Sequence, residues 1–66
     1  MRKEVRELVD EAVRQGWRSK VLSSGHVQLF SPQGRTIVTL AGTPSGQRWR
    51  DKAISQLRKG GFRWSP

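Results

Sequence analysis

The stretch Ser23-Ser24-Gly25-His26-Val27-Gln28-Leu29-Phe30 decides the fold of this chain. Its first three residues are small, and they make a connection of hairpin length. The following residues alternate in polarity, so that Val27 and Leu29 share one face of a strand. The opposite face carries His26, Gln28 and Phe30. This pattern predicts a strand over residues 26–30 that buries Val27 and Leu29 and leaves the only histidine of the chain on the open face.

Two further strands are predicted beside this one. Residues 17–22 alternate and place Arg18 and Lys20 on the same face, while residues 35–40 are rich in β-branched side chains. Between the second and third strands, Ser31-Pro32-Gln33-Gly34 has proline and glycine at their favoured turn positions. Two consecutive hairpins therefore predict a three-stranded antiparallel meander.

A helix is predicted before the meander and another after it. Residues 3–15 carry an apolar stripe at helical spacing, and Gly16 ends the helix. The stripe consists of Val5, Leu8, Val9, Ala12 and Val13. Residues 46–59 form the second helix, capped either by Thr43-Pro44 or by Ser45, and Gly60-Gly61 ends it. Its apolar face consists of Trp49, Ala53, Ile54 and Leu57.

The predicted fold class is α+β, in the order α-β-β-β-α and as a single domain over residues 1–66. Each helix has one apolar stripe, so both helices are expected on one face of the sheet. Core positions are expected for Trp17, Trp49 and Phe62. The segment 62–66 either folds back on its aromatic residues or stays loose, and Trp64 is the best candidate for an exposed aromatic side chain.

The basic charge of the chain lies after the first helix. The net charge is +8, yet residues 1–16 hold four basic and four acidic residues, whereas residues 17–66 hold nine basic residues and one acid, Asp51. Such an imbalance favours a polyanionic partner, most simply nucleic acid, although a membrane surface or a merely solvated cationic surface has the same composition. The candidate RNA-binding side chains are Arg18, Lys20, Arg35, Arg48 and Lys52, and Ser24 and Gly25 are candidates to offer backbone N–H groups to a phosphate.

Composition excludes several other classes of function. The chain has no cysteine, which excludes disulfides and thiolate chemistry and fits a cytoplasmic location. No apolar run approaches the roughly 18 residues of a membrane span, and the charged N-terminus does not read as a signal region. No second histidine, cysteine or carboxylate pair lies at metal-ligand spacing, so neither a metal nor another cofactor is expected.

One histidine can contribute to the cleavage of RNA. The nucleophile is the 2′-hydroxyl of RNA itself, so the protein needs a base for its proton, an acid for the leaving 5′-oxygen and cations for the phosphate. An imidazole group, with an ordinary pKa of about 6.5, performs either proton transfer near neutrality. His26 does not readily do both in one turnover, so water, a lysine or an arginine would complete a slow reaction. The alternative for His26 is an ordinary surface histidine at the start of a strand.

Three segments resemble the HicA toxins, small ribonucleases of bacterial toxin–antitoxin pairs. They are Arg6-Glu7-Leu8-Val9 through Gly16-Trp17, Ser24-Gly25-His26-Val27-Gln28-Leu29, and Trp49 through Gly60. The resemblance covers roughly residues 5–61. It implies a double-stranded-RNA-binding-like fold, metal-independent endoribonuclease cleavage of mRNA, and neutralisation by a HicB-like antitoxin. Only His26 matches the catalytic position of that family.

Three functions are therefore carried forward. The first is a cytoplasmic HicA-like toxin that binds and cleaves mRNA. The second is a non-enzymatic RNA- or DNA-binding module on the same scaffold, in which His26 has no catalytic role. The third is a small regulatory protein that binds another protein, and an acidic partner would suit the charge of +8 as well as RNA does.

Overall fold

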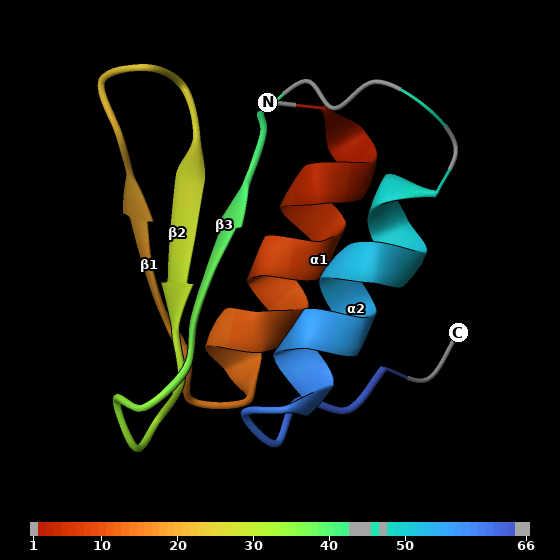
Figure 1. The fold of residues 1–66 in the computed structure, drawn as a ribbon. Helices are drawn as coiled ribbons and strands as arrows, with labels where there is room; N and C mark the ends of the chain where they lie inside the picture. Colours follow the sequence, from red (N-terminus) through yellow and green to blue (C-terminus); the bar gives the residue numbers. More distant parts are fainter. Residues whose placement is uncertain (1, 43–45, 47, 65–66) are drawn as a thin grey trace.

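The secondary structure follows the predicted order (Figure 1). A computed structural model describes residues 2–42, 46 and 48–64. Its elements are helix α1 (Lys3–Arg14), strands β1 (Arg18–Val21), β2 (Val27–Phe30) and β3 (Ile37–Leu40), and helix α2 (Trp49–Arg58). The α+β class and the order α-β-β-β-α are thus confirmed.

The strands form one antiparallel sheet in the order β1-β2-β3, with β2 in the centre. Along β2, Val27 and Leu29 are completely buried, whereas Gln28 and Phe30 are only half-buried. Because successive side chains of a strand point to opposite faces, this alternation separates an inner face from an outer one. The alternation predicted from the sequence is confirmed.

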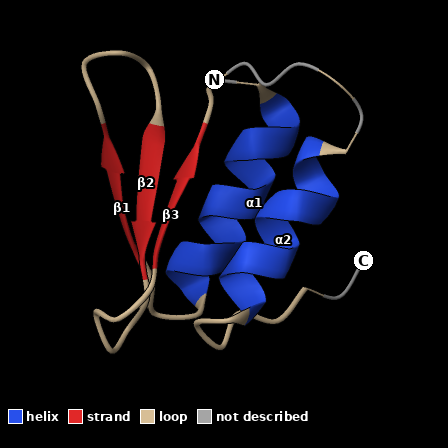
Figure 2. Cartoon of the chain, viewed as in Figure 1, coloured by secondary structure: helices blue, strands red, loops and turns tan. Residues whose placement is uncertain are grey.

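Both helices lie on the inner face of the sheet (Figure 2). Helix α1 contacts β1, and α2 contacts β3. The inner residues Val38 and Leu40 of β3 are buried together with the apolar residues of both helices. On the outer face, no other element covers the sheet within the described residues (Figure 1). This two-layer arrangement is the one that a single apolar stripe on each helix predicts.

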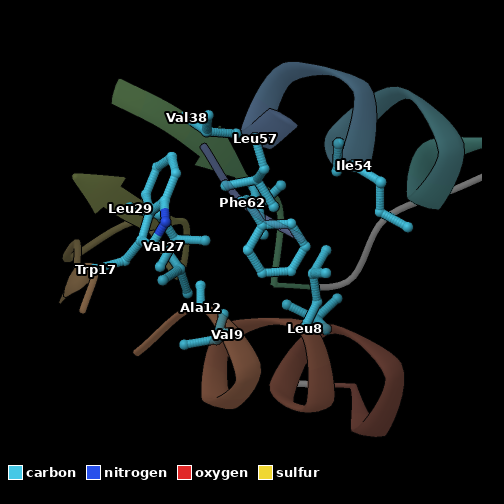
Figure 3. Close-up of a cluster of buried hydrophobic side chains, with 13 residues drawn as sticks. Leu8, Val9, Ala12, Trp17, Val27, Leu29, Val38, Ile54, Leu57 and Phe62 are labelled. Atoms are coloured by element: carbon cyan, nitrogen blue, oxygen red, sulfur yellow. The ribbon is translucent and has the colours of Figure 1, made fainter. Parts of the chain in front are cut away.

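The core contains side chains from α1, β2, β3 and α2, together with Trp17 and Phe62. Figure 3 shows many of them pointing into one cluster. The predicted α1 stripe is buried at Val5, Leu8, Val9 and Ala12. Val13 is the exception, because its side chain is 46% exposed. At 3.6 residues per turn, Val13 lies about 80° around the helix from Val5, at the border of the stripe. Of the residues in the predicted stripe, Val13 thus lies outside the core.

The strands are shorter than their sequence patterns. Strand β3 begins at Ile37 rather than at residue 35, because the backbone N–H groups of the two preceding residues are hydrogen-bonded to a side chain. The buried Ser31 hydroxyl accepts hydrogen bonds from the backbone N–H groups of Arg35 and Thr36, both at 3.1 Å. These bonds close the turn between β2 and β3 and remove two residues from the ladder. Residues 17, 22 and 26 also lie just outside the strands.

Helix α2 begins later than its pattern predicts. Its first helical residue is Trp49, preceded by Arg48 as the N-cap, and no side chain caps it by a hydrogen bond. The two predicted caps, Thr43-Pro44 and Ser45, lie outside the described residues. At the other end the prediction is confirmed, since the helix ends at Arg58 and turns through Gly60-Gly61.

Trp17 closes the core at the end of the sheet where α2 ends. Its ring is buried and meets the ring of Phe62 edge to face, with centroids 6.3 Å apart and an interplanar angle of 86°. Gly60 lies against the same ring, because a Cβ atom placed on Gly60 would lie 2.6 Å from one Trp17 ring carbon and 3.0 Å from Cβ of Thr36. A side chain at residue 60 and the Trp17 ring therefore compete for the same space.

The chain after α2 folds back onto the core. Phe62 is buried, and the Trp64 ring stacks on it with centroids 6.2 Å apart and an interplanar angle of 19°. Trp64 is consequently half-buried rather than exposed, which corrects the expectation from its place near the chain end. Of the two alternatives for this segment, folding back is confirmed for residues 62–64, and residues 65–66 lie outside the described part.

Gln15, which follows α1, holds this segment in place. Its side-chain amide donates to the carbonyl of Arg63, and the backbone N–H of Arg63 donates back to Oε1 of Gln15 at 2.9 Å. The same amide donates to the Glu11 carboxylate at 2.8 Å. The hydrogen bonds from Arg14 and from Gln15 lower the pKa of Glu11, because they stabilise its ionised form. One polar side chain thus joins the end of α1 to the chain after α2.

The contact between Gly60 and Trp17 predicts a strong effect of a single methyl group. We expect Gly60→Ala to lower the free energy of unfolding by about 1–3 kcal/mol, because overpacking forces the ring or the backbone to move. Urea denaturation followed by tryptophan fluorescence measures the change. The matched control is Lys59→Ala, at an exposed neighbouring position, which should leave stability nearly unchanged. Equal stability of the two variants would contradict the packing described.

Candidate nucleic-acid interface

The outer face of the sheet consists of two cross-strand rows of side chains. In the first row Phe30 of β2 lies between Arg18 of β1 and Ile37 of β3. In the second row Gln28 lies between Lys20 and Thr39. All of these side chains are exposed except those of Gln28 and Phe30, which are half-buried in the central strand. The face therefore combines two cations, two polar groups and an apolar pair.

No carboxylate belongs to this face of the described strands. The five acidic residues of the chain all lie on helices, namely Glu4, Glu7, Asp10 and Glu11 on α1 and Asp51 on α2. Both helices pack on the inner face of the sheet. The outer face consequently presents Arg18 and Lys20 without an opposing charge of its own, which favours an anionic ligand.

His26 lies at the start of the central strand on this same side. Its carbonyl accepts a hydrogen bond from the backbone N–H of Leu22 at 2.8 Å, which continues the pairing of β1 with β2 by one step. Since Val27 points to the core, the alternation of the strand places the His26 side chain on the outer side. The imidazole is exposed to solvent. A ligand on the outer face can therefore reach it.

The imidazole is held from one side by a neighbouring hydroxyl. Oγ of Ser24 lies 3.1 Å from Nδ1 of His26, within hydrogen-bonding distance. When Nδ1 carries the proton and donates to Ser24, Nε2 is left as the free basic nitrogen. Ser24 was predicted to offer its backbone to a phosphate, but its clearest contact is this one to the histidine.

Lys20 is the cation nearest to His26 in the register of the sheet. It pairs directly with Gln28, so that His26, which lies two residues before Gln28 and just outside β2, is its diagonal neighbour. Diagonal neighbours in an antiparallel pair have Cα atoms about 7–8 Å apart, which a lysine side chain can span. The register thus makes Lys20 the cation of β1 that lies closest to His26 along the strands.

Gly25 has a structural role in the loop that carries His26. Its backbone N–H, a candidate donor to a phosphate, donates to the carbonyl of Leu22 at 2.9 Å and so closes the turn. Its φ of +90° is a conformation that L side chains rarely adopt. Its carbonyl oxygen lies against Gly42, where a Cβ atom would approach to 2.6 Å. Gly42 was not among the predicted site residues, and only the structure reveals the contact.

The remaining predicted cations lie elsewhere. Arg35 precedes β3 at the end of the sheet opposite to His26, two residues before Ile37, which pairs with Phe30. Arg48 and Lys52 belong to α2, on the helical side (Figure 1). Lys52 lines a shallow hollow between α2 and the edge strand, together with Thr39. Of the predicted cations, the structure thus brings Arg18 and Lys20 onto the face that His26 shares.

Two features bear on other classes of site. Within the described residues, no group of three or more His, Cys, Asp or Glu side chains is placed to hold a metal ion. Neither α1 nor α2, the helices of the described part, has the length and apolar character needed to cross a membrane.

Comparison with known proteins found no relative: no family model, no curated protein and no solved structure matches this chain. The case for a function therefore depends on the residues of the outer face and their geometry.

The contact of Gly42 with the His26 loop can be tested directly. We expect Gly42→Ala to displace the Gly25 carbonyl, because no Cβ atom fits at 2.6 Å from a backbone oxygen. The amide resonances of residues 22–26 should shift in a 1H–15N NMR spectrum, and stability should fall by about 1–3 kcal/mol. Thr39→Ala, at an exposed position on β3, is the control. Unchanged resonances in the Gly42 variant would show that the loop is not held there.

Proposed function

We propose that this protein binds RNA on the outer face of its sheet and cleaves it with His26 as the group that transfers protons. The observation that carries the proposal is an exposed histidine at one end of a cationic face that has no carboxylate. RNA supplies both the negative charge that such a face attracts and the 2′-hydroxyl that an imidazole can activate.

The contact between Ser24 and Nδ1 supports a different role for each nitrogen of the imidazole. Nδ1, held by Ser24 at 3.1 Å, keeps its proton, and Nε2 accepts the proton of the 2′-hydroxyl. The 2′-oxygen then forms a bond to the phosphorus, and the bond from phosphorus to the 5′-oxygen breaks. The products are a 2′,3′-cyclic phosphate on one fragment and a 5′-hydroxyl on the other. The proton that Nε2 takes from the 2′-hydroxyl balances the proton that the leaving 5′-oxygen receives, so the step needs no further reactant.

Lys20 supplies the positive charge that the reaction needs. Its ammonium group, diagonal to His26, stabilises the charge that develops on the phosphate oxygens. The leaving 5′-oxygen takes its proton from Lys20 or from water. Since a single imidazole serves the site, the rate gain from acid–base catalysis should be at the lower end of the usual range of about 10²–10⁴-fold.

The resemblance of residues 5–61 to the HicA toxins supports the same activity. On this proposal the substrate is mRNA, the location is the cytoplasm, and a HicB-like antitoxin is the protein partner that neutralises the enzyme. The double-stranded-RNA-binding-like fold of that family belongs to the proposal as well, alongside the α-β-β-β-α order that the chain has.

The catalytic role of His26 predicts a selective loss of cleavage. Wild-type protein should cut a structured mRNA in EDTA and leave 2′,3′-cyclic phosphate ends, which end-group analysis detects. His26→Ala should lose about 10²-fold or more in rate. Ser24→Ala should lose less, because it removes only the group that orients the imidazole. Circular dichroism and RNA binding serve as controls, since both should stay unchanged in the two variants.

The same assay also shows whether the cleavage comes from this protein or from a contaminating nuclease. If His26→Ala cleaves as fast as the wild type, the activity does not belong to this site and the catalytic proposal fails. If neither protein cleaves but both bind RNA equally, the protein is a non-enzymatic RNA-binding module. That second function is favoured by one observation, namely that the chain offers a single imidazole for a reaction that moves two protons.

RNA binding by the outer face predicts a specific dependence on salt. For single strands the logarithm of the binding constant falls with the logarithm of salt concentration with a slope of about −0.7 per phosphate contact. Arg18→Gln and Lys20→Gln should each make this slope shallower by about that amount. Arg58→Gln, an exposed change at the end of α2, is the matched control and should leave the slope unchanged. Fluorescence polarisation of a labelled oligonucleotide measures all four proteins.

A further inference from the structure

We propose that the substrate of the outer face is single-stranded RNA, with one base stacked on Phe30 at the end of the sheet opposite to His26. This inference rests on the proposed function and adds to it the class of RNA and the position of the chain on the protein. It concerns the row Arg18–Phe30–Ile37, in which Phe30 and Ile37 have been given no role so far.

The row combines an apolar surface with a cation. Ile37 is 58% exposed, and Phe30, half-buried, lies beside it in the central strand. On the other side of Phe30 lies the exposed guanidinium-bearing Arg18. A nucleotide presents the complementary pair of groups, because its base has an apolar face that stacks on aromatic rings and its phosphate is an anion.

A hollow of the surface lies at the same place. Phe30, Arg18 and Lys20 line it together with Ser19 and the turn 31–34. The ring and both cations of the outer face thus border one depression. A base in this hollow would contact the ring, and the neighbouring phosphates would lie within reach of the two cations.

The other half-exposed aromatic rings are already engaged. The guanidinium of Arg50 lies 6.0 Å from the centre of the Trp49 ring, and Trp64 is stacked on Phe62. Phe30 forms neither an aromatic pair nor a cation–π contact within the described residues. The partly exposed ring that is available to stack on a base is therefore Phe30 on the outer face, and not Trp49 or Trp64.

A single strand fits this face better than a duplex. In a duplex each base is stacked between its neighbours, so that no base face is available to the Phe30 ring. Double-stranded RNA is recognised through phosphates and 2′-hydroxyls over about 16 base pairs, whereas the three strands here are each only four residues long. The outer face offers two cations and one ring, which suits a short unpaired segment.

The position of Phe30 relative to His26 gives the binding mode a consequence for cleavage. The two residues are four positions apart on the same face of one strand, a distance of about 13 Å. A base held on Phe30 therefore fixes which phosphate lies at the imidazole. Cleavage should occur at a constant spacing from the base that stacks most strongly.

Phe30→Leu and Phe30→Tyr test the stacking interaction. Leucine keeps an apolar side chain of similar size but has no ring, whereas tyrosine keeps the ring. We expect Phe30→Leu to weaken the binding of a single-stranded oligonucleotide about fivefold or more, since stacking of one base typically contributes at least that much. Phe30→Tyr should bind like the wild type. Val13→Ala, the loss of an exposed apolar side chain on α1, is the control.

A second readout uses 2-aminopurine, a fluorescent base that is quenched when it stacks. Moved along the oligonucleotide, it should be quenched by the wild type at one position and remain bright with Phe30→Leu. The duplex of the same sequence should bind more weakly than the single strand. Should Phe30→Leu fail to fold, as judged by circular dichroism, the quenching profile of the wild type and the comparison of single strand with duplex still test the proposal.

The possible failures are distinguishable. If the wild type binds no RNA at low salt, the proposed function itself falls. If it binds RNA but Phe30→Leu binds as well as the wild type, or if the duplex binds more tightly than the single strand, the stacking proposal is overturned while RNA binding stands. In that case weaker RNA binding by Arg48→Gln and Lys52→Gln would place the interface on the helical side of the sheet.

Discussion

The alternation of side chains along the central strand is the constraint on which the rest of the structure depends. Val27 and Leu29 are completely buried against both helices, and this burial fixes the register of the sheet. A slip of one residue would expose both of them and turn His26 and Phe30 into the core, because the side-chain period of a strand is two. The burial of Val27 and Leu29 and the outward position of His26 are therefore consequences of the same pattern.

Most of the architecture could be predicted from the sequence because it depends on local periodicity. The stripe on α1, the alternation of β2 and the glycine stop after α2 are all visible in short windows. What could not be predicted depends on contacts between distant residues. The fit of Gly60 against Trp17, and the use of the Ser31 hydroxyl to shorten β3, involve partners that no local pattern identifies.

The candidate site shows the same division. Alternation placed His26 on the open face and Arg18 with Lys20 on one side of the first strand, but it did not reveal that Lys20 is diagonal to His26 or that Ser24 contacts the imidazole. Charge counts grouped Arg35, Arg48 and Lys52 with these residues, although the fold sends them to another end or another layer. Counting charges along the sequence does not show on which side of the sheet each residue lies. Once the two layers are known, the position of all five acidic residues on the helices explains why the outer face has no carboxylate.

The contact between Gly42 and the loop of His26 has a practical consequence at the start of the chain. The carbonyl of Gly42 accepts a hydrogen bond from the backbone N–H of Arg2 at 3.0 Å, while Gly42 itself packs against the carbonyl of Gly25. Arg2 is thus connected through Gly42 to the loop that carries His26. An affinity tag fused ahead of Arg2 would emerge beside the end of the sheet that carries His26, so protein prepared to test the role of this residue is better tagged elsewhere or freed of its tag.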